Sequence, residues 1–317
     1  MKTLLWMMIV SGSGAALAQP APPAVGPAAT DPATAVPPAP AAAAAAPGVT
    51  RATADRAAQD PAAGPGFVVI DPLDASSQAG IQISYLGLKG GSSSDNLTLL
   101  RFEGRARYVD KRTGLGGYVQ LPFAYARASN NGQSATITDV GDLEIGGIFA
   151  PRLGSPNFGL VMHVGIALPT GEKGEEGLVG TLASAAALPA FYNALPRGTT
   201  VKLGVSPMFR SGIVFGRLDL GFDSNIDADQ VSVGNGIHFN AGVGIDLGTA
   251  DVMLESENLA VLSQGSSDGA TLNAVALSTR VNAGVVSPHL AVVIPVDRDE
   301  RDVIDFAVVA GVDFKLP

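Results

Sequence analysis

Apolar and polar residues alternate along much of the region between residues 79 and 315, and this alternation predicts β-strands. Every second residue from Ile237 to Leu247 is apolar, while the residues between them are polar or glycine. The stretch from Ile304 to Phe314 also places an apolar residue at every second position. A period of two indicates a strand with one apolar and one polar face. Twelve strands are predicted, at 79–88, 97–109, 115–127, 140–150, 158–168, 199–209, 212–222, 236–247, 251–261, 271–285, 288–296 and 302–315.

The connections between these strands alternate between short and long. Short connections are predicted at 110–114, 151–157, 210–211, 248–250 and 286–287, and mostly longer ones at 89–96, 128–139, 169–200, 223–235, 262–270 and 297–301. Most of the strands are close to the ~9–11 residues that a tilted strand needs to cross a membrane. Short turns at one end and long loops at the other are typical of outer-membrane barrels. We therefore predict an all-β fold, an antiparallel transmembrane β-barrel of about twelve strands with its termini in the periplasm.

Aromatic residues on the apolar faces are expected to form two girdles. If the first strand runs outward, five aromatic residues fall at the outer ends of the strands and five at the periplasmic ends. Aromatic rings of outer-membrane barrels concentrate at these two interfaces. The outer set is Tyr85, Phe123, Tyr125, Phe222 and Phe239, and the periplasmic set is Tyr108, Phe149, Phe158, Phe209 and Phe314.

The N-terminal region predicts export. Residues 1–18 have a basic start at Lys2, a short apolar run and a small-residue cleavage site, Ala16-Leu17-Ala18, which together indicate a signal peptide. Residues 19–66 are rich in Ala and Pro and contain little large apolar surface to bury, so we expect a disordered periplasmic linker. The barrel domain is then expected at 67–317, in the bacterial outer membrane.

Composition narrows the partners. Charged residues make up 15% of the chain, below the roughly 25% of average soluble proteins. A net charge of -9 argues against nucleic acid as a partner. The sequence contains no uninterrupted apolar stretch of ~18 residues, so no membrane helix is predicted. The expected partners are outer-membrane lipids, the barrel assembly machinery and a small-molecule solute.

The polar faces of the strands carry many ionisable residues, which would line the lumen of a barrel. Opposite charges in a lumen can pair across strands, and they can also set the field that a passing solute experiences. The alternating set from Arg101 to Arg107 is the most distinctive feature, because its guanidiniums could bind an anion or balance lumen carboxylates. The predicted lumen-lining residues are Arg101, Glu103, Arg105, Arg107, Asp142, Glu144, His163, Lys202, Arg217, Asp219, His238, Asp246 and Arg280.

The sequence offers no recognisable catalytic, cofactor or metal motif. The three histidines, His163, His238 and His289, are too scattered for a metal motif, and the chain has no cysteine. Ser206 and His163 fall on neighbouring predicted strands, but this pairing is a weak indication of a nucleophile and base. We therefore expect a protein that is not an enzyme and that uses no cofactor. The longest loop, 169–200, is expected either to narrow the mouth of the barrel or to cover its rim.

Two nearby segments resemble a known family. Residues 140–146, Val-Gly-Asp-Leu-Glu-Ile-Gly, precede residues 165–172, Gly-Ile-Ala-Leu-Pro-Thr-Gly-Glu. A Gly-Asp strand followed by a strand ending in a Pro-Thr-Gly turn resembles the outer-membrane barrel family named for the MetA pathway of phenol degradation. The resemblance covers about residues 139–175 and implies an outer-membrane channel or transporter, in some members linked to uptake of aromatic or hydrophobic compounds.

These features together predict a passive channel or transporter for small or hydrophobic solutes. One alternative is a structural or surface-interaction barrel that transports nothing and is plugged by its own lumen charges. A second alternative is a soluble periplasmic β-sandwich that binds a ligand, in which the polar strand faces would point outward to water.

Overall fold

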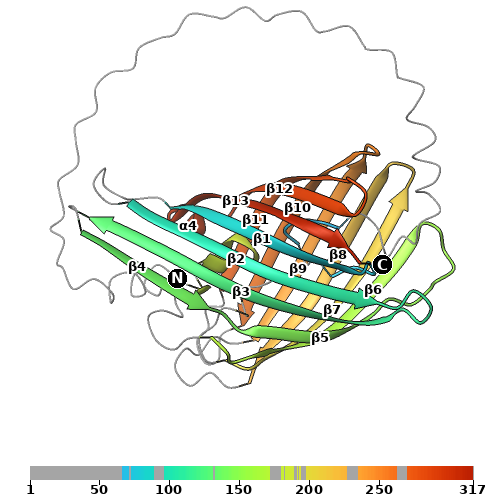
Figure 1. The fold of residues 1–317 in the computed structure, drawn as a ribbon, viewed down its shortest axis with the longest axis horizontal. Helices are drawn as coiled ribbons and strands as arrows, with labels where there is room; N and C mark the ends of the chain where they lie inside the picture. The colour runs from blue at the N-terminus through green and yellow to red at the C-terminus, as the bar shows by residue number, and fades with distance from the viewer. Residues whose placement is uncertain are drawn as a thin grey trace, which may run out of the picture.

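The computed structural model describes residues 66–70, 73–88, 96–130, 133–171, 180–181, 183–188, 191, 193, 198–226, 235–262 and 270–316. The predicted signal peptide, 1–18, and the predicted linker, 19–66 apart from its last residue, lie outside the described residues. The described strands form one antiparallel sheet that closes on itself into a barrel (Figure 1). The predicted fold class is confirmed.

The strands follow one another around the barrel in chain order, and β2–β3 pairing completes the ring. Both β4 and β5 pair with β3, so the wall has twelve strand positions. Tight turns join several strands; Gly212 and Gly248 have φ angles of 60° and 90°, which glycine adopts at little cost. The strands are β1 Gln78–Leu88, β2 Asn96–Val109, β3 Leu115–Asn130, β4 Gln133–Val140, β5 Leu143–Phe149, β6 Phe158–Leu168, β7 Thr200–Ser211, β8 Val214–Asn225, β9 Asn235–Asp246, β10 Ala250–Leu262, β11 Ala270–Val281, β12 Val286–Pro295 and β13 Ile304–Lys315.

The fourth predicted strand, 140–150, is corrected by the structure. Two shorter strands, β4 and β5, pair with successive parts of β3 in its place. Between them the Gly141 N–H donates to the Pro122 carbonyl at 2.9 Å, while the Asp142 N–H donates to the Asn193 carbonyl of the third long loop at 2.8 Å. Because Pro122 has no N–H, it cannot complete the ladder at this point. The strand is therefore interrupted at Gly141 and Asp142.

Two further predictions are corrected at the long-loop end of the barrel. The predicted loop at 128–139 is largely a continuation of β3 and β4. The last strand begins at Ile304, after the short helix α4, Arg298–Arg301. The pairing of β1 with β13 shifts register between Gly87 and Leu88, and Asp305 is consequently exposed, although simple alternation places it in the interior.

The apolar faces of the strands point away from the barrel interior. Ile81, Tyr108 and Leu277 are 57%, 57% and 63% exposed, respectively. All ten residues of the two predicted aromatic girdles lie on this outer face. A soluble sandwich would bury its apolar faces, so the β-sandwich alternative is wrong.

Candidate functional site

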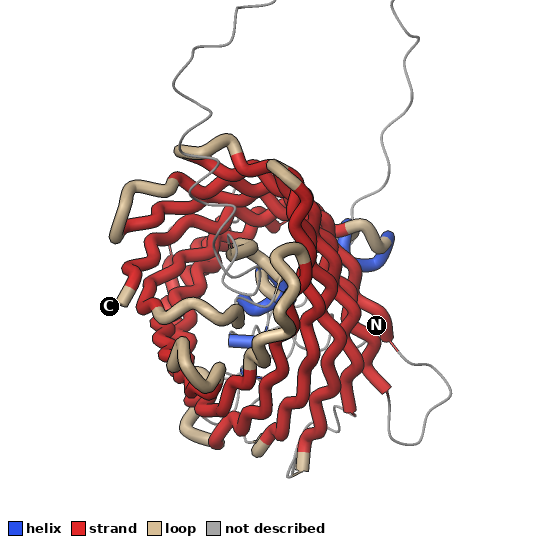
Figure 2. The backbone as a smooth tube through the Cα atoms, turned by 90° about the vertical axis from the view of Figure 1, so that its right-hand side faces the viewer, coloured by secondary structure: helices blue, strands red, loops and turns tan. Residues whose placement is uncertain are grey.

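The barrel interior holds all thirteen of the residues that the sequence predicts to line the lumen. Each is buried although it carries an ionisable side chain, because the inward strand positions alternate with the exposed apolar ones. Figure 2 shows that the ring of strands also surrounds loop and short helical segments. The interior is therefore a charged space that other parts of the chain partly fill.

The arginines of β2 are engaged in ion pairs. Arg101 pairs with Glu103 on the same strand. Arg105 pairs with Asp313 of β13 at 3.1 Å, and Arg107 pairs with Asp74, ahead of β1, at 2.7 Å. The sequence left two interpretations of these arginines, binding of an anion and balance of lumen carboxylates. The observed ion pairs agree with the second.

Asp313 lies close to side chains from three other strands. Besides Arg105 of β2, its carboxylate pairs with Arg280 of β11 and lies 3.4 Å from Nδ1 of His289 on β12. Arg280 is one of the predicted lumen residues, and Asp313 alternates inward in the last strand. The contact between Arg105 and Asp313 depends on barrel closure, because β13 is brought near β2 only through its pairing with β1.

Residues 66–70, which precede the first strand, enter the barrel and bind its interior wall. The backbone N–H groups of Val68, Val69 and Ile70 all donate to Oε2 of Glu255 on β10, at 3.1, 2.9 and 3.0 Å. The Gly66 carbonyl accepts from Nη1 of Arg280 at 2.9 Å. Three converging backbone donors are a strong site for one carboxylate, so Glu255 anchors this segment.

The side chains of this N-terminal region occupy part of the short-turn half of the interior. Phe67 packs against Phe215 of β8, with ring centroids 5.5 Å apart, and its ring lies over Gly242 of β9. Leu73 belongs to a second buried cluster near the turns, with Val109 among its members. Sequence analysis gave this segment no role. The available signal was the apolar run Phe-Val-Val-Ile, which follows the Ala/Pro stretch directly.

Part of the loop at 169–200 enters the barrel from the opposite end. Its described residues include a short 3-10 helix, Ser184–Ala186. Ala183 and Leu188 are buried in the same apolar cluster as Phe67. The Asn193 side-chain amide donates to Glu144 of β5, which fastens the end of this segment to the wall. Of the two roles considered for this loop, narrowing of the mouth therefore agrees with the structure.

The interior wall has an apolar zone and a polar zone. Toward the long loops, β10–β13 and β1–β3 present mainly small or apolar side chains, including Leu99, Ala276 and Val309, and the inserted loop packs there. At this same long-loop end, the wall made by β7, β8 and β9 carries polar side chains, and Thr200, Asp223 and His238 are buried there. Polar side chains therefore line one side of the barrel from the long loops as far as Arg217, and Met208 and Phe215 are buried nearer the turns.

Ion pairs also organise this polar wall. Lys202 of β7 lies 3.1 Å from Glu144, which additionally accepts a hydrogen bond from the Tyr118 hydroxyl. On β8, Arg217 pairs with Asp219 and donates to the Ser206 hydroxyl at 3.0 Å. Ser206 is thus bonded to an arginine, and the Ser206–His163 pairing considered in the sequence gains no support.

A carboxyl group outside the strands lies beside the apolar zone. Glu300 of α4 is 7% exposed and accepts a hydrogen bond from the Asn273 N–H at 3.3 Å. Burial raises the pKa of the Glu300 carboxyl to about 7, and the nearby charge of Asp297 acts in the same direction. The loop that carries α4 therefore contains an acid that titrates near neutral pH.

Within the described residues, no group of three or more His, Asp or Glu side chains is arranged to hold a metal ion. In the same part of the chain, no helix is long and apolar enough to cross a membrane.

Comparison with solved structures places this architecture among outer-membrane β-barrels. The COG4313 outer membrane channel from Pseudomonas putida F1 superimposes with a TM-score of 0.55 and 15% identity, over 80% of this chain and 99% of that chain. The translocator domain of the autotransporter NalP from Neisseria meningitidis gives a TM-score of 0.41 and 10% identity, over 78% and 91% of the two chains. No family model and no curated protein sequence matches the chain. The outer-membrane barrel fold is therefore shown, while the resemblance to the phenol-degradation family stays a prediction.

The expectation that the protein is not an enzyme is corrected by the same comparison. An active-site variant of outer membrane phospholipase A from Escherichia coli also matches, with a TM-score of 0.42 and 9% identity, over 84% of this chain and 98% of that chain. The matched barrels therefore include an enzyme as well as a channel.

Proposed function

We propose that the protein is a passive outer-membrane channel for small solutes, which move along the polar wall formed by β7, β8 and β9. The observation that carries this proposal is the series of buried polar side chains along most of that wall. Buried polar side chains extend from Asp223 at the long-loop end, through Lys202 and Asp219, to Arg217 nearer the turns. Polar side chains that line a pore set its selectivity by their charge and hydrogen-bonding capacity.

Unused hydrogen-bonding groups on this wall support the proposal. Among the described residues, Oγ1 of Thr200 and Nδ2 of Asn240 have no hydrogen-bond partner within the protein. Buried polar atoms of this kind are normally satisfied by water or by a ligand. A hydrated path is therefore chemically suited to this side of the interior, whereas toward the long loops the opposite side is occupied by apolar packing.

The comparison with the Pseudomonas putida channel also supports the proposal, because that match extends over nearly the whole of the other chain. A twelve-stranded barrel encloses a narrower lumen than the 16–18-stranded porins that hold wide aqueous channels. The inserted segments narrow it further, so the proposed solutes are small. Residues 66–70 would have to move, or leave a narrow passage beside Phe67, for a solute to cross.

We further propose that residues 1–18 direct export, that residues 19–66 form a periplasmic linker, and that the barrel assembly machinery inserts residues 67–317 into the outer membrane. The thirteen predicted lumen residues are proposed to influence ion selectivity through the charges that their pairs leave facing the path.

Asp223→Asn tests the channel assignment. The variant removes a carboxylate at the long-loop end of the path, so we expect the reversal potential under a salt gradient to shift toward anions in planar bilayers. The shift should be largest in dilute salt, because the Debye length falls from about 10 Å at 0.1 M to about 3 Å at 1 M. Asp305→Asn, on the exposed face of β13, is the matched control. Absence of any ionic current from the wild-type protein would refute the channel.

A further inference from the structure

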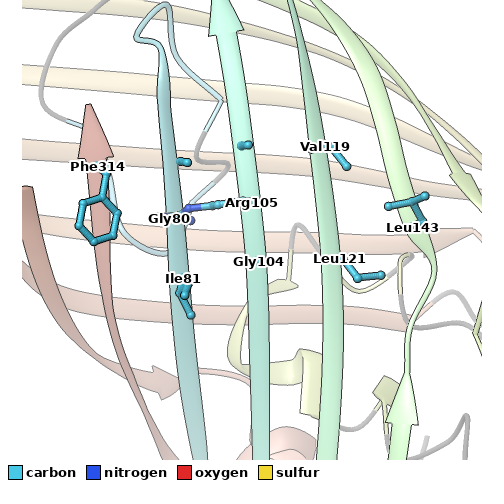
Figure 3. Close-up of a pocket in the computed structure, with 10 residues that line it drawn as sticks. Gly80, Ile81, Gly104, Arg105, Val119, Leu121, Leu143 and Phe314 are labelled. Carbon is cyan, nitrogen blue, oxygen red and sulfur yellow. The ribbon is translucent and has the colours of Figure 1, made fainter. Parts of the chain in front are cut away.

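A shallow groove crosses the membrane-facing surface of the barrel where β13, β1, β2, β3 and β5 lie side by side (Figure 3). Its volume is about 490 Å³. Gly104 and Ala106 of β2 provide a low floor, and bulkier side chains such as Ile81, Leu121 and Phe314 stand on either side. A methyl group placed at Gly104 would meet no other atom within 4 Å, so this position is open.

The groove lies at the depth of the acyl chains in one leaflet. Gly104 is five residues from the end of β2 at the short turns, which corresponds to about 16 Å along a strand. A strand tilted by roughly 35–45° descends less steeply than its length, so Gly104 lies about 12–13 Å below the turns. Half of the hydrocarbon core is about 15 Å thick. Apolar side chains at this depth face lipid.

Basic residues gather at the short turns that join strands of the groove. Lys111 and Arg112 lie in the turn between β2 and β3, and Arg152 lies in the turn between β5 and β6; all three are exposed. The Arg152 guanidinium donates to the Lys111 carbonyl, which holds the two turns together. The short turns at 212–213, 247–249 and 282–285 contain no charged residue. The basic turns therefore belong to the same part of the barrel wall as the groove, which includes β2, β3 and β5.

The one acidic side chain of these two turns, Asp110, accepts hydrogen bonds within its own turn. Oδ1 of Asp110 accepts the Arg112 N–H at 3.0 Å, and Oδ2 accepts the Thr113 hydroxyl at 3.0 Å. These hydrogen bonds lower the pKa of the Asp110 carboxyl. The two turns together carry three cationic side chains and this single carboxylate.

We propose that the groove and the basic turns form a binding site for one anionic phospholipid. An acyl chain lies over Gly104 and Ala106, and the phosphate is held by Lys111, Arg112 and Arg152. An apolar groove whose floor at Gly104 lies about 12–13 Å from clustered guanidinium and ammonium groups matches a molecule with a hydrocarbon tail and an anionic head. This site is on the outer surface, so it is independent of any passage through the lumen.

Lipid titration of the delipidated, detergent-solubilised full-length chain, followed by native mass spectrometry, tests the site. We expect phosphatidylglycerol to bind more tightly than phosphatidylcholine. Substituting Lys111, Arg112 and Arg152 with glutamine, one at a time, should weaken phosphatidylglycerol binding about fivefold for each charge removed. Binding of phosphatidylcholine should change little.

Gly104→Leu fills the groove and is expected to weaken the binding of both lipids. Gly147→Leu is its matched control, because Gly147 lies on the outer face of β5 outside the groove and its nearest atoms would be 3.9 Å from an added methyl group. The heat-dependent shift in gel mobility confirms that each variant is folded. Equal affinity for the two lipids, or an unchanged affinity in Gly104→Leu, would overturn the proposal.

Discussion

Deletion of residues 66–70 is expected to raise the single-channel conductance of the barrel severalfold. The segment holds Phe67 against Phe215 and is tied to the wall by three backbone hydrogen bonds to Glu255. Removing it takes away a bulky aromatic ring and four further residues from the short-turn half of the lumen. The strands themselves lose none of their pairing, so the barrel should still close.

A deletion of equal length within the Ala/Pro region, residues 41–45, is the control. It shortens the chain by the same number of residues and leaves the contacts with Glu255 intact. Conductance of this control should equal that of the wild type in planar bilayers. If the deletion of 66–70 leaves conductance unchanged, the segment does not obstruct the solute path.

Asp313→Asn is expected to lower the free energy of unfolding by about 3–5 kcal/mol, the cost of breaking a buried ion pair by removing one partner. Asp313 is 1% exposed and serves Arg105 and Arg280 simultaneously. Without its charge, two buried guanidiniums from different strands lose their shared carboxylate. Urea titration of the barrel folded in phospholipid vesicles measures the effect.

Asp305→Asn provides the comparison on the same strand. Asp305 is exposed, and substitutions at exposed positions usually change stability by less than about 0.5 kcal/mol. Similar unfolding midpoints for the two variants would show that the Asp313 cluster contributes little to stability. A large loss for Asp313→Asn alone would assign the cluster a role in joining β13 to β2 on one side and to β11 on the other.

The strands and their two faces could be predicted from the sequence because both follow from local periodicity. The predicted strand 158–168 coincides with β6, and every second residue from Phe158 onward faces outward. The alternation of apolar and polar residues gave wrong predictions where the strand pairing is irregular. At Pro122 the missing donor interrupts the opposite strand, and at Gly87 a register shift turns Asp305 outward.

The sequence could predict which residues point into the interior, but it could not predict which residues contact each other there. Alternation identified Arg105, Arg280 and Glu144 as inward. Their partners come from strands distant in sequence, or from segments outside the strands, such as Asp74 and Asn193. Whether a segment that precedes the first strand folds into the lumen depends on three-dimensional fit, which periodicity does not encode.

Tryptophan fluorescence in vesicles that contain brominated phospholipids tests the central claim, that apolar strand faces meet lipid and polar faces enclose the lumen. The only tryptophan of the chain is Trp6, in the predicted signal peptide, so an introduced tryptophan reports on one position. Leu277 is exposed on the outer face of β11, while its neighbour Ala276 is buried in the interior. We predict strong quenching by brominated lipid for Leu277→Trp and weak quenching for Ala276→Trp. Equal quenching at the two positions, or quenching at residue 276 alone, would contradict the barrel orientation on which the proposed channel depends.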